Sequence, residues 1–286
     1  MSPKVTHSVE FNIDEAKATA IGKTILDQFY NKRGFFQGYE MPEYILPPNL
    51  EKSSREHALY LTYVISVDYM VNAVKLWNNS REEYYAYPEH FQPESILRMG
   101  DQSLTTIVRR VGARFPSTGA RAWKAISKIL LERYDGDPRR ITETPQPIKS
   151  IKAKIADFPH LKGNKLSNFY LRAMGENQLL KITNFNELDI PVDIQVARFT
   201  IYTGVLGLEH GTFRGCVHEE PLRNLIEETW RDAAHNLGTY PWKLDEPIWT
   251  IGSKLCSKKK CGQCPVKQYC DKMFDVRFEN AVASWD

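Results

Sequence analysis

The stretch from Pro159 to Lys165 reads PHLKGNK and separates two segments of helical apolar spacing, 148–158 and 164–174. The pattern predicts two short helices joined by a tight turn. Gly163 would let backbone N–H groups and the start of the second helix approach an anion closely, and the helix dipole favours negative charge there. The element therefore suits a sequence-independent grip on a phosphate backbone, although a purely structural turn would look the same when taken alone.

Helical periodicity continues on both sides of this element. Helices are predicted at 14–30, 53–78, 93–99, 102–111, 117–134, 194–204, 221–237 and 247–255, and almost nothing resembles a strand. The predicted fold class is all-α. A chain of 286 residues can form two domains. We predict a helical barrel over residues 53–189 that ends in the two-helix element, and a second helical domain built from residues 1–52 and 190–286.

The composition is that of a globular protein, with 42% hydrophobic and 26% charged residues. No apolar run approaches the roughly 18 residues of a membrane span, and residues 1–23 carry charge throughout. We therefore expect an intracellular protein, cytoplasmic or nucleoid-associated, with no membrane partner. Disulfides are disfavoured in such a compartment, so the five cysteines need another explanation.

Four of the cysteines fall within fifteen residues: Cys256, Cys261, Cys264 and Cys270. Only Cys261 and Cys264 form a close Cys-x2-Cys pair, and the gaps to the cysteines before and after this pair differ in length. Pro265 directly follows Cys264. Structural zinc sites usually present two knuckles separated by a longer loop, so the spacing favours a four-iron, four-sulfur (4Fe-4S) cluster, with zinc as the alternative. The fifth cysteine, Cys216, lies outside this spacing and is expected to be an inert buried thiol.

Positive charge is unevenly distributed along the chain, although the net charge is only +3. The range 98–162 holds 14 Lys or Arg against 6 Asp or Glu, and the range 254–272 holds six lysines against Asp271. Such clustering is expected of a protein with a polyanionic partner. Solvated helix faces are the alternative interpretation.

Two residues near these features combine into a chemical pattern. Lys165 follows Gly163 by two positions, and Asp193 comes 28 residues later, at the entry to an apolar helix. Attack on the anomeric carbon of a sugar requires at least a nucleophile, such as an amine, and a carboxylate in the same cleft. Each residue also has a plain alternative, since Lys165 could contact phosphate and Asp193 could cap its helix.

The order of these motifs resembles that in endonuclease III and adenine glycosylase relatives of the helix-hairpin-helix DNA glycosylase superfamily. The motifs are PHLKGNK at 159–165, Val192-Asp193, and WTIG at 249–252 ahead of the four cysteines. The likeness extends roughly from Arg55 to Met273. It implies two helical domains with a DNA-binding cleft between them, a helix-hairpin-helix motif and a C-terminal iron-sulfur loop.

By this resemblance, Lys165 matches the lysine that attacks C1′ and leaves an imine to the sugar, and Asp193 matches the essential aspartate. The implied function is base excision repair: a DNA glycosylase with apurinic-apyrimidinic (AP) lyase activity. Its partner would be double-stranded DNA with a damaged or mismatched base, bound by a monomer. DNA contacts are predicted for Leu161, Lys162, Gly163, Asn164, Gln195, Lys258, Lys259 and Lys260. The alternatives are a catalytically silent DNA-binding accessory of the same fold and a modified-nucleoside N-glycosidase.

The chain also departs from the family pattern. Leu161 stands where the hairpin usually has its first glycine, Gln195 replaces a common histidine, and the first cysteine gap is four residues instead of six. The segment 66–69 lacks the glutamine that relatives insert beside the lesion. The substrate base is therefore not inherited from the resemblance.

Overall fold

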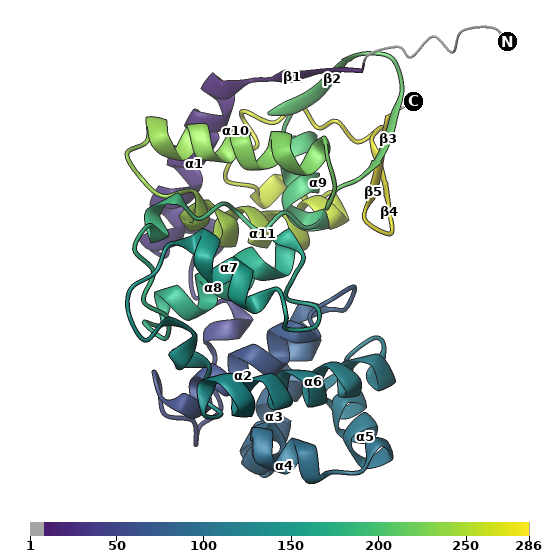
Figure 1. The fold of residues 1–286 in the computed structure, drawn as a ribbon. Coiled ribbons are helices and arrows are strands. Elements are labelled where there is room, and N and C mark those ends of the chain that lie inside the picture. The colour runs from purple at the N-terminus through teal and green to yellow at the C-terminus, as the bar shows by residue number, and fades with distance from the viewer. Residues whose placement is uncertain (1–8, 286) are drawn as a thin grey trace, which may run out of the picture. The chain divides into compact units, whose positions relative to one another are not determined.

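The computed structural model describes residues 9–285, which form two compact units (Figure 1). The terminal unit combines the residues up to Tyr39 with those from Asp189 onward, and the central unit is Glu40–Leu188. Residues 40–52, which we had grouped with the termini, thus belong to the central unit. The predicted all-α class is confirmed, because helices dominate both units.

The central unit contains seven of the α-helices within the described residues. They are α2 (Arg55–Ser66), α3 (Ala73–Ala86), α4 (Pro93–Arg98), α5 (Asp101–Val111), α6 (Pro116–Tyr134), α7 (Ile148–Ile155) and α8 (Asn164–Glu176). Their core includes the fully buried rings of Tyr63, Phe91 and Trp123. The Trp123 indole N–H donates to the backbone oxygen of Tyr63 at 3.0 Å, which ties α6 to α2.

The single helix predicted at 53–78 is two helices, α2 and α3, separated by a bend. Ser54 caps α2 by accepting a hydrogen bond from the His57 N–H, and Asn72 caps α3 in the same way. Met70, between them, takes a left-handed φ of 53°. Apolar residues continue across the bend, which is why periodicity did not reveal it.

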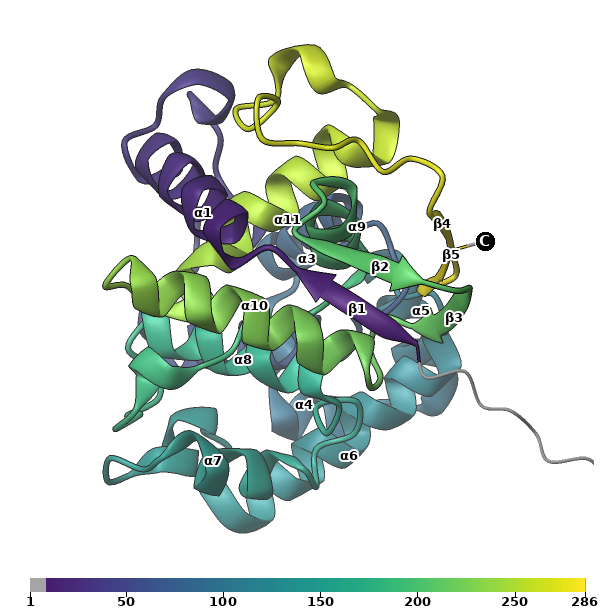
Figure 2. The ribbon, with the colours of Figure 1, turned by 90° about the horizontal axis from the view of Figure 1, so that it is seen from above.

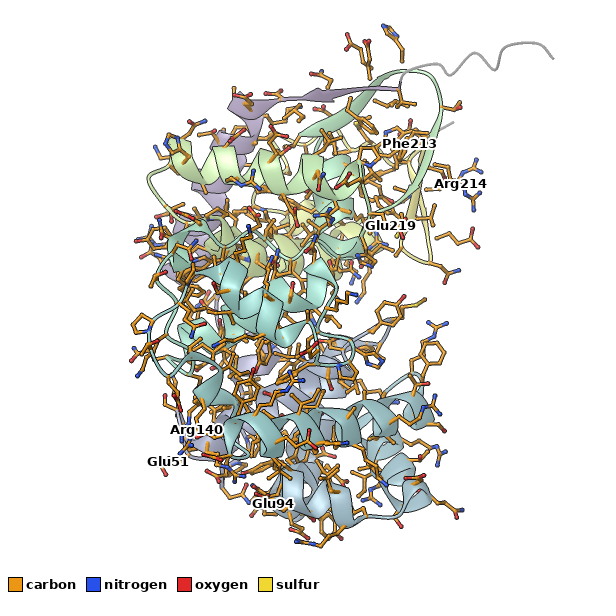
Figure 3. All side chains as sticks on the ribbon, viewed as in Figure 1. Glu51, Glu94, Arg140, Phe213, Arg214 and Glu219 are labelled. Carbon is orange, nitrogen blue, oxygen red and sulfur yellow. The ribbon has the colours of Figure 1, made fainter. Side chains whose placement is uncertain are left out.

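At one end of the central unit, Arg55 forms hydrogen bonds that hold two loops against the start of α2. Its guanidinium donates to the backbone oxygen of Gly136 at 3.0 Å and to Gln92 at 2.7 Å. Figure 3 shows Glu51, Glu94 and Arg140 at this end, and Arg55 reaches Glu94 at 3.3 Å. These contacts fix the start of α2. The opposite end of α2 lies next to the two-helix element.

The terminal unit is built on four helices: α1 (Glu15–Tyr30), α9 (Ile194–Tyr202), α10 (Leu222–Asn236) and α11 (Asp245–Lys254). Ile21, Phe199, Trp230 and Ile251 are fully buried in its core. The Trp230 indole donates to the Thr200 hydroxyl at 2.9 Å, which joins α10 to α9. Helix α9 therefore lies at the centre of this unit's packing.

Five short strands also belong to the terminal unit, where almost none were predicted. β1 (Glu10–Ile13) pairs antiparallel with β2 (Leu206–His210), side by side in Figure 2, and β3 (Phe213–Cys216), β5 (Val282–Trp285) and β4 (Arg277–Glu279) form a second sheet in that order. Each strand has only three to five residues, too few for a clear alternating pattern. Arg214, labelled in Figure 3, is exposed on β3.

Within the described part of the chain, none of the helices combines the length and apolarity that crossing a bilayer requires.

Candidate active site and cysteine loop

The two-helix element forms as predicted, with α7 and α8 joined by the turn at residues 156–163. His160 takes the left-handed conformation in this turn, with φ 70°, whereas Leu161 is fully buried. The His160 Nδ1–H donates to the backbone oxygen of Ser66 at 2.8 Å, so the turn rests on the end of α2. Gly163 is the N-cap of α8, and a Cβ built there would meet no atom within 4 Å.

Lys165 occupies the first turn of α8 and is half-buried. Its amine donates to the backbone oxygen of Asp68, just beyond the end of α2, at 3.3 Å. No carboxylate among residues 9–285 lies within salt-bridge distance of this amine. The lysine is thus oriented by a neutral backbone acceptor.

Asp193 is the N-cap of α9, and both of its carboxylate oxygens accept hydrogen bonds. Oδ1 accepts from the backbone N–H groups of Gln195 at 2.7 Å and Val196 at 3.0 Å. Oδ2 accepts from the indole N–H of Trp249 at 3.0 Å. The plain alternative of a helix cap is therefore correct, but the cap uses only one of the two oxygens.

The position of Asp193 depends on a close crossing of α9 and α11. A Cβ at Gly252 would lie 2.2 Å from the backbone oxygen of Gln195, so only glycine allows this approach. On the other side, the His218 Nδ1–H donates to the backbone oxygen of Val192 at 3.0 Å. Trp249 and His218 are thus supporting residues to which the sequence analysis gave no role; the WTIG motif was the only hint of the first.

The cysteine loop follows α11 and contains two single-turn helices, Cys256–Lys258 and Cys261–Gln263. Cys256, Cys261, Cys264 and Cys270 line one pocket, together with apolar groups that include Phe199, Leu255 and Phe274. Cys216 lies instead on β3, paired with Val282 of β5. None of the five cysteines forms a disulfide.

Burial is the main influence on the thiols in this pocket. It raises the pKa of Cys256 far above its usual range, and the other three cysteines of the loop raise it further. Burial also raises the pKa of Cys264 to about 11. Thiols whose pKa is raised by burial become thiolates beside a strong positive charge, such as that of a metal centre.

Within the described residues, the cysteine loop shows no compact group of ligands for a single ion. Among residues 9–285, no three His, Cys, Asp or Glu side chains are grouped closely enough to hold one metal ion. The donor set is four sulfurs that line one pocket together with apolar groups. Cysteine sulfurs in this number are the ligands that zinc and iron-sulfur clusters both take.

The residues predicted to contact DNA differ in exposure. Lys162, Gly163 and Asn164 are exposed in the central unit, and Lys258, Lys259 and Lys260 are exposed in the terminal unit. The prediction for Leu161 needs correction, because its side chain fills the core and only its backbone can face a ligand. Gln195 accepts a hydrogen bond from Arg198 at 2.5 Å, and the Lys259 amine lies 5.1 Å from the centre of the Phe274 ring.

A basic groove between α5 and α6 was not singled out by residue in the sequence analysis. Arg109 and Arg121 line it beside hydroxyl groups such as that of Ser117. Asp101 is paired with Lys124, whereas neither arginine has a carboxylate within salt-bridge distance in residues 9–285. The groove falls within the basic range 98–162, so the charge imbalance was the signal that pointed to it.

Three comparisons with known proteins agree with this architecture. Residues 164–280 match the model of a family described as "AGOG: N-glycosylase/DNA lyase". The chain is 25% identical over 189 residues to endonuclease III of Rickettsia conorii, an alignment that covers 65% of this chain and 71% of that protein. It is also 25% identical over 183 residues to endonuclease III of Rickettsia prowazekii, covering 63% of this chain and 68% of that one.

Solved structures give the same fold at lower sequence identity. A trapped covalent intermediate of endonuclease III with DNA has a TM-score of 0.59 at 13% identity, covering 91% of this chain and 97% of that one. A thermostable thymine-DNA glycosylase has a TM-score of 0.55 at 15% identity, covering 91% and 98%.

The class defined by this fold and these motifs is that of the helix-hairpin-helix proteins. Residues 164–280 carry the match to the N-glycosylase/DNA lyase family, and the chain as a whole is similar to endonuclease III.

Proposed function

We propose that this protein is a base excision repair DNA glycosylase with AP lyase activity. It would act on duplex DNA that contains a damaged or mismatched base, taking the nucleotide out of the stack before cutting its glycosidic bond. The similarity to endonuclease III and to a trapped covalent protein–DNA intermediate supports this class of reaction.

The observation that carries the proposal is the state of Lys165. Its amine is half-buried and bonded to the Asp68 carbonyl, without a carboxylate partner among residues 9–285. A single hydrogen bond to a backbone carbonyl orients the amine and still lets it move onto C1′ of a bound nucleotide.

The proposed chemistry begins when the neutral Lys165 amine attacks C1′. The C1′–N bond breaks, and the base leaves with the bonding electrons and takes up a proton. The negative charge of Asp193 stabilises the positive charge that develops on the sugar, and the attacking nitrogen loses its proton to solvent. The C1′–O4′ bond then breaks, O4′ takes up a proton, and the opened sugar becomes an imine at C1′. The imine loses a C2′ proton, the C3′–O bond breaks, and the 3′ phosphate departs by β-elimination.

A panel of lesion duplexes tests the proposal. Oxidised pyrimidines, 8-oxoguanine and deaminated bases are each offered in end-labelled duplex and as free nucleosides. Mismatches are offered in duplex alone. We expect base release coupled to strand cleavage on at least one duplex and on no nucleoside. Duplex binding without base release would indicate the silent accessory, and turnover of free nucleosides would indicate a nucleosidase.

For the cysteine loop we propose that Cys256, Cys261, Cys264 and Cys270 hold a 4Fe-4S cluster. The support is their common apolar pocket and their mutual effect on ionisation. The cluster's role would be structural, because neither glycosidic cleavage nor β-elimination needs an electron-transfer step. Protein purified without chelator should contain about four irons per chain, and Cys216→Ser should retain them. Zinc without iron would contradict this assignment.

The DNA surface would include the turn at 162–164, Gln195 and the lysines of the cysteine loop, used by a monomer. Phosphate contacts carry no base information, so replacing Lys258, Lys259 and Lys260 with glutamine should weaken binding to all duplexes alike. The slope of log affinity against log salt should also become shallower, by about one unit per lost contact. The matched control is Lys128→Gln on α6, an exposed lysine 3.7 Å from the carboxylate of Glu132. A change of lesion preference with an unchanged salt slope would argue against phosphate contact.

A further inference from the structure

Trp249 is the one side chain that holds Oδ2 of Asp193 among the hydrogen bonds of the described residues. Its indole Nε1 lies 3.0 Å from that oxygen. The ring is half-buried on α11, between the fully buried Ile248 and Thr250. The donor therefore projects from a packed helix, so its direction is fixed by the fold.

The approach of α11 to α9 determines where this donor lies. Gly252 sits three residues after Trp249, and its Cα faces the backbone oxygen of Gln195, at a distance that would put a Cβ 2.2 Å from that oxygen. The same crossing therefore places the indole against the carboxylate at the start of α9. The contact lies entirely within the terminal unit and joins residues 56 positions apart in the chain.

The hydrogen bonds leave the two carboxylate oxygens in different states. Oδ1 accepts from two backbone N–H groups of α9, which satisfies it. Oδ2 accepts only the indole N–H in the described structure and keeps a lone pair for another partner. Rotation of the carboxylate plane is blocked, because turning it would break all three bonds.

We infer that Trp249 is a positioning residue for Asp193: its indole N–H orients Oδ2 toward the reacting sugar. The inference rests on the proposed glycosylase function and deepens it. Trp249 acts through Asp193 and need not touch the substrate for this purpose. A hydrogen bond to a charged group is among the stronger ones in proteins, so its loss has a measurable effect on rate.

The test compares Trp249→Phe with Trp230→Phe in single-turnover excision on the preferred lesion. Trp230 is a matched control, since its indole also ties a neighbouring helix to α9 but donates to Thr200 and has no hydrogen bond to Asp193. Trp249→Phe should lower the excision rate constant by about 10- to 100-fold with little change in duplex affinity or melting temperature. Trp230→Phe should lower the melting temperature instead and leave the rate constant of the folded protein unchanged.

A double-mutant cycle separates positioning from packing. Added to Asp193→Asn, the Trp249→Phe change should cause almost no further loss of excision, because the oriented charge is already gone. Equal additional loss in that background would overturn the inference. If Trp249→Phe folds poorly, replacement of Trp249 by benzothienylalanine keeps the ring shape while removing the N–H, and the same loss of rate is expected.

A readout without DNA distinguishes failure of this inference from failure of the proposed function. In the full-length protein, the Trp249 indole N–H resonance should move markedly on Asp193→Asn, while that of Trp230 stays in place. An unmoved Trp249 resonance overturns the inference even if the enzyme excises bases. Wild-type protein that releases no base from any duplex overturns the proposed function instead, whatever the resonance does.

Discussion

The turn that carries Lys165 and the helix crossing that carries Asp193 each contain one glycine, and the two glycines differ in what their missing side chains would meet. At Gly163 a Cβ would enter open space, and φ is an ordinary −71°. At Gly252 a Cβ would overlap the backbone oxygen of Gln195. The fold therefore requires the second glycine and not the first. Glycine would be required at position 163 only if a ligand approached the backbone there, as a phosphate of bound DNA would.

The Lys165 amine and the Asp193 carboxylate also differ, in how firmly hydrogen bonds within the protein hold them. The Lys165 amine makes one 3.3 Å hydrogen bond to a carbonyl, whereas the Asp193 carboxylate accepts three, each of 3.0 Å or less. A nucleophile has to move onto C1′ and can be only lightly held. A charge that stabilises a transition state acts best when it is fixed beforehand. The contrast predicts different behaviour for variants of the two regions.

The largest effect is expected from Lys165→Gln. Strand cleavage should fall by roughly a thousandfold or more, because the nucleophile is removed, while duplex affinity changes by less than about threefold. Cleavage is measured on end-labelled duplex and affinity by gel shift. Base release that continues without strand cleavage would show a monofunctional enzyme in which Asp193 activates water. Cleavage at the wild-type rate would refute the role of Lys165.

Asp193→Asn should rank second. Base excision should slow by about 100- to 1000-fold, since a preorganised charge is lost while the asparagine oxygen can still cap α9. The melting temperature should therefore change little, which circular dichroism can check. A protein that loses stability in proportion to its activity would show that Asp193 serves mainly as a cap.

Gly252→Ala should act on the fold and thereby on the site. The added Cβ forces α11 away from α9, which should cost about 1–3 kcal/mol of the free energy of unfolding. Excision should also slow, because the indole of Trp249 moves with α11. Gly207→Ala on β2 is the control, since a Cβ there meets nothing within 4 Å. Denaturant unfolding that gives equal stability for the two variants would contradict the close crossing.

Gly163→Ala should show the smallest effect and the opposite pattern. Stability should change by less than about 1 kcal/mol, because the restriction that alanine places on the unfolded chain is offset by its weaker preference for an N-cap position. Affinity for every duplex should fall by about 3- to 10-fold, as a Cβ obstructs a backbone hydrogen bond to phosphate. Unchanged affinity for both lesion and undamaged duplexes would mean that the turn does not contact DNA.

Sequence periodicity predicted most helices and the turn that presents Lys165, because both are local patterns. It missed the bend between α2 and α3, since apolar residues continue on both sides of Met70 and the break depends on the Asn72 cap. It could not reveal the bond between Trp249 and Asp193, which are 56 residues apart and meet only through the packing of α9 on α11. Leu161 was assigned to the DNA surface because it lies in the hairpin turn of the family resemblance, whereas the fold buries its side chain.

The most direct test of the central claim is to locate the covalent bond. Wild-type protein is incubated with its preferred lesion duplex and borohydride, which reduces the imine, and the adduct is digested and sequenced by mass spectrometry. The account predicts the reduced sugar on the side-chain nitrogen of Lys165, and no adduct when Lys165→Gln protein is used. An adduct on another lysine, or base release from the wild-type protein with no adduct at all, would contradict it.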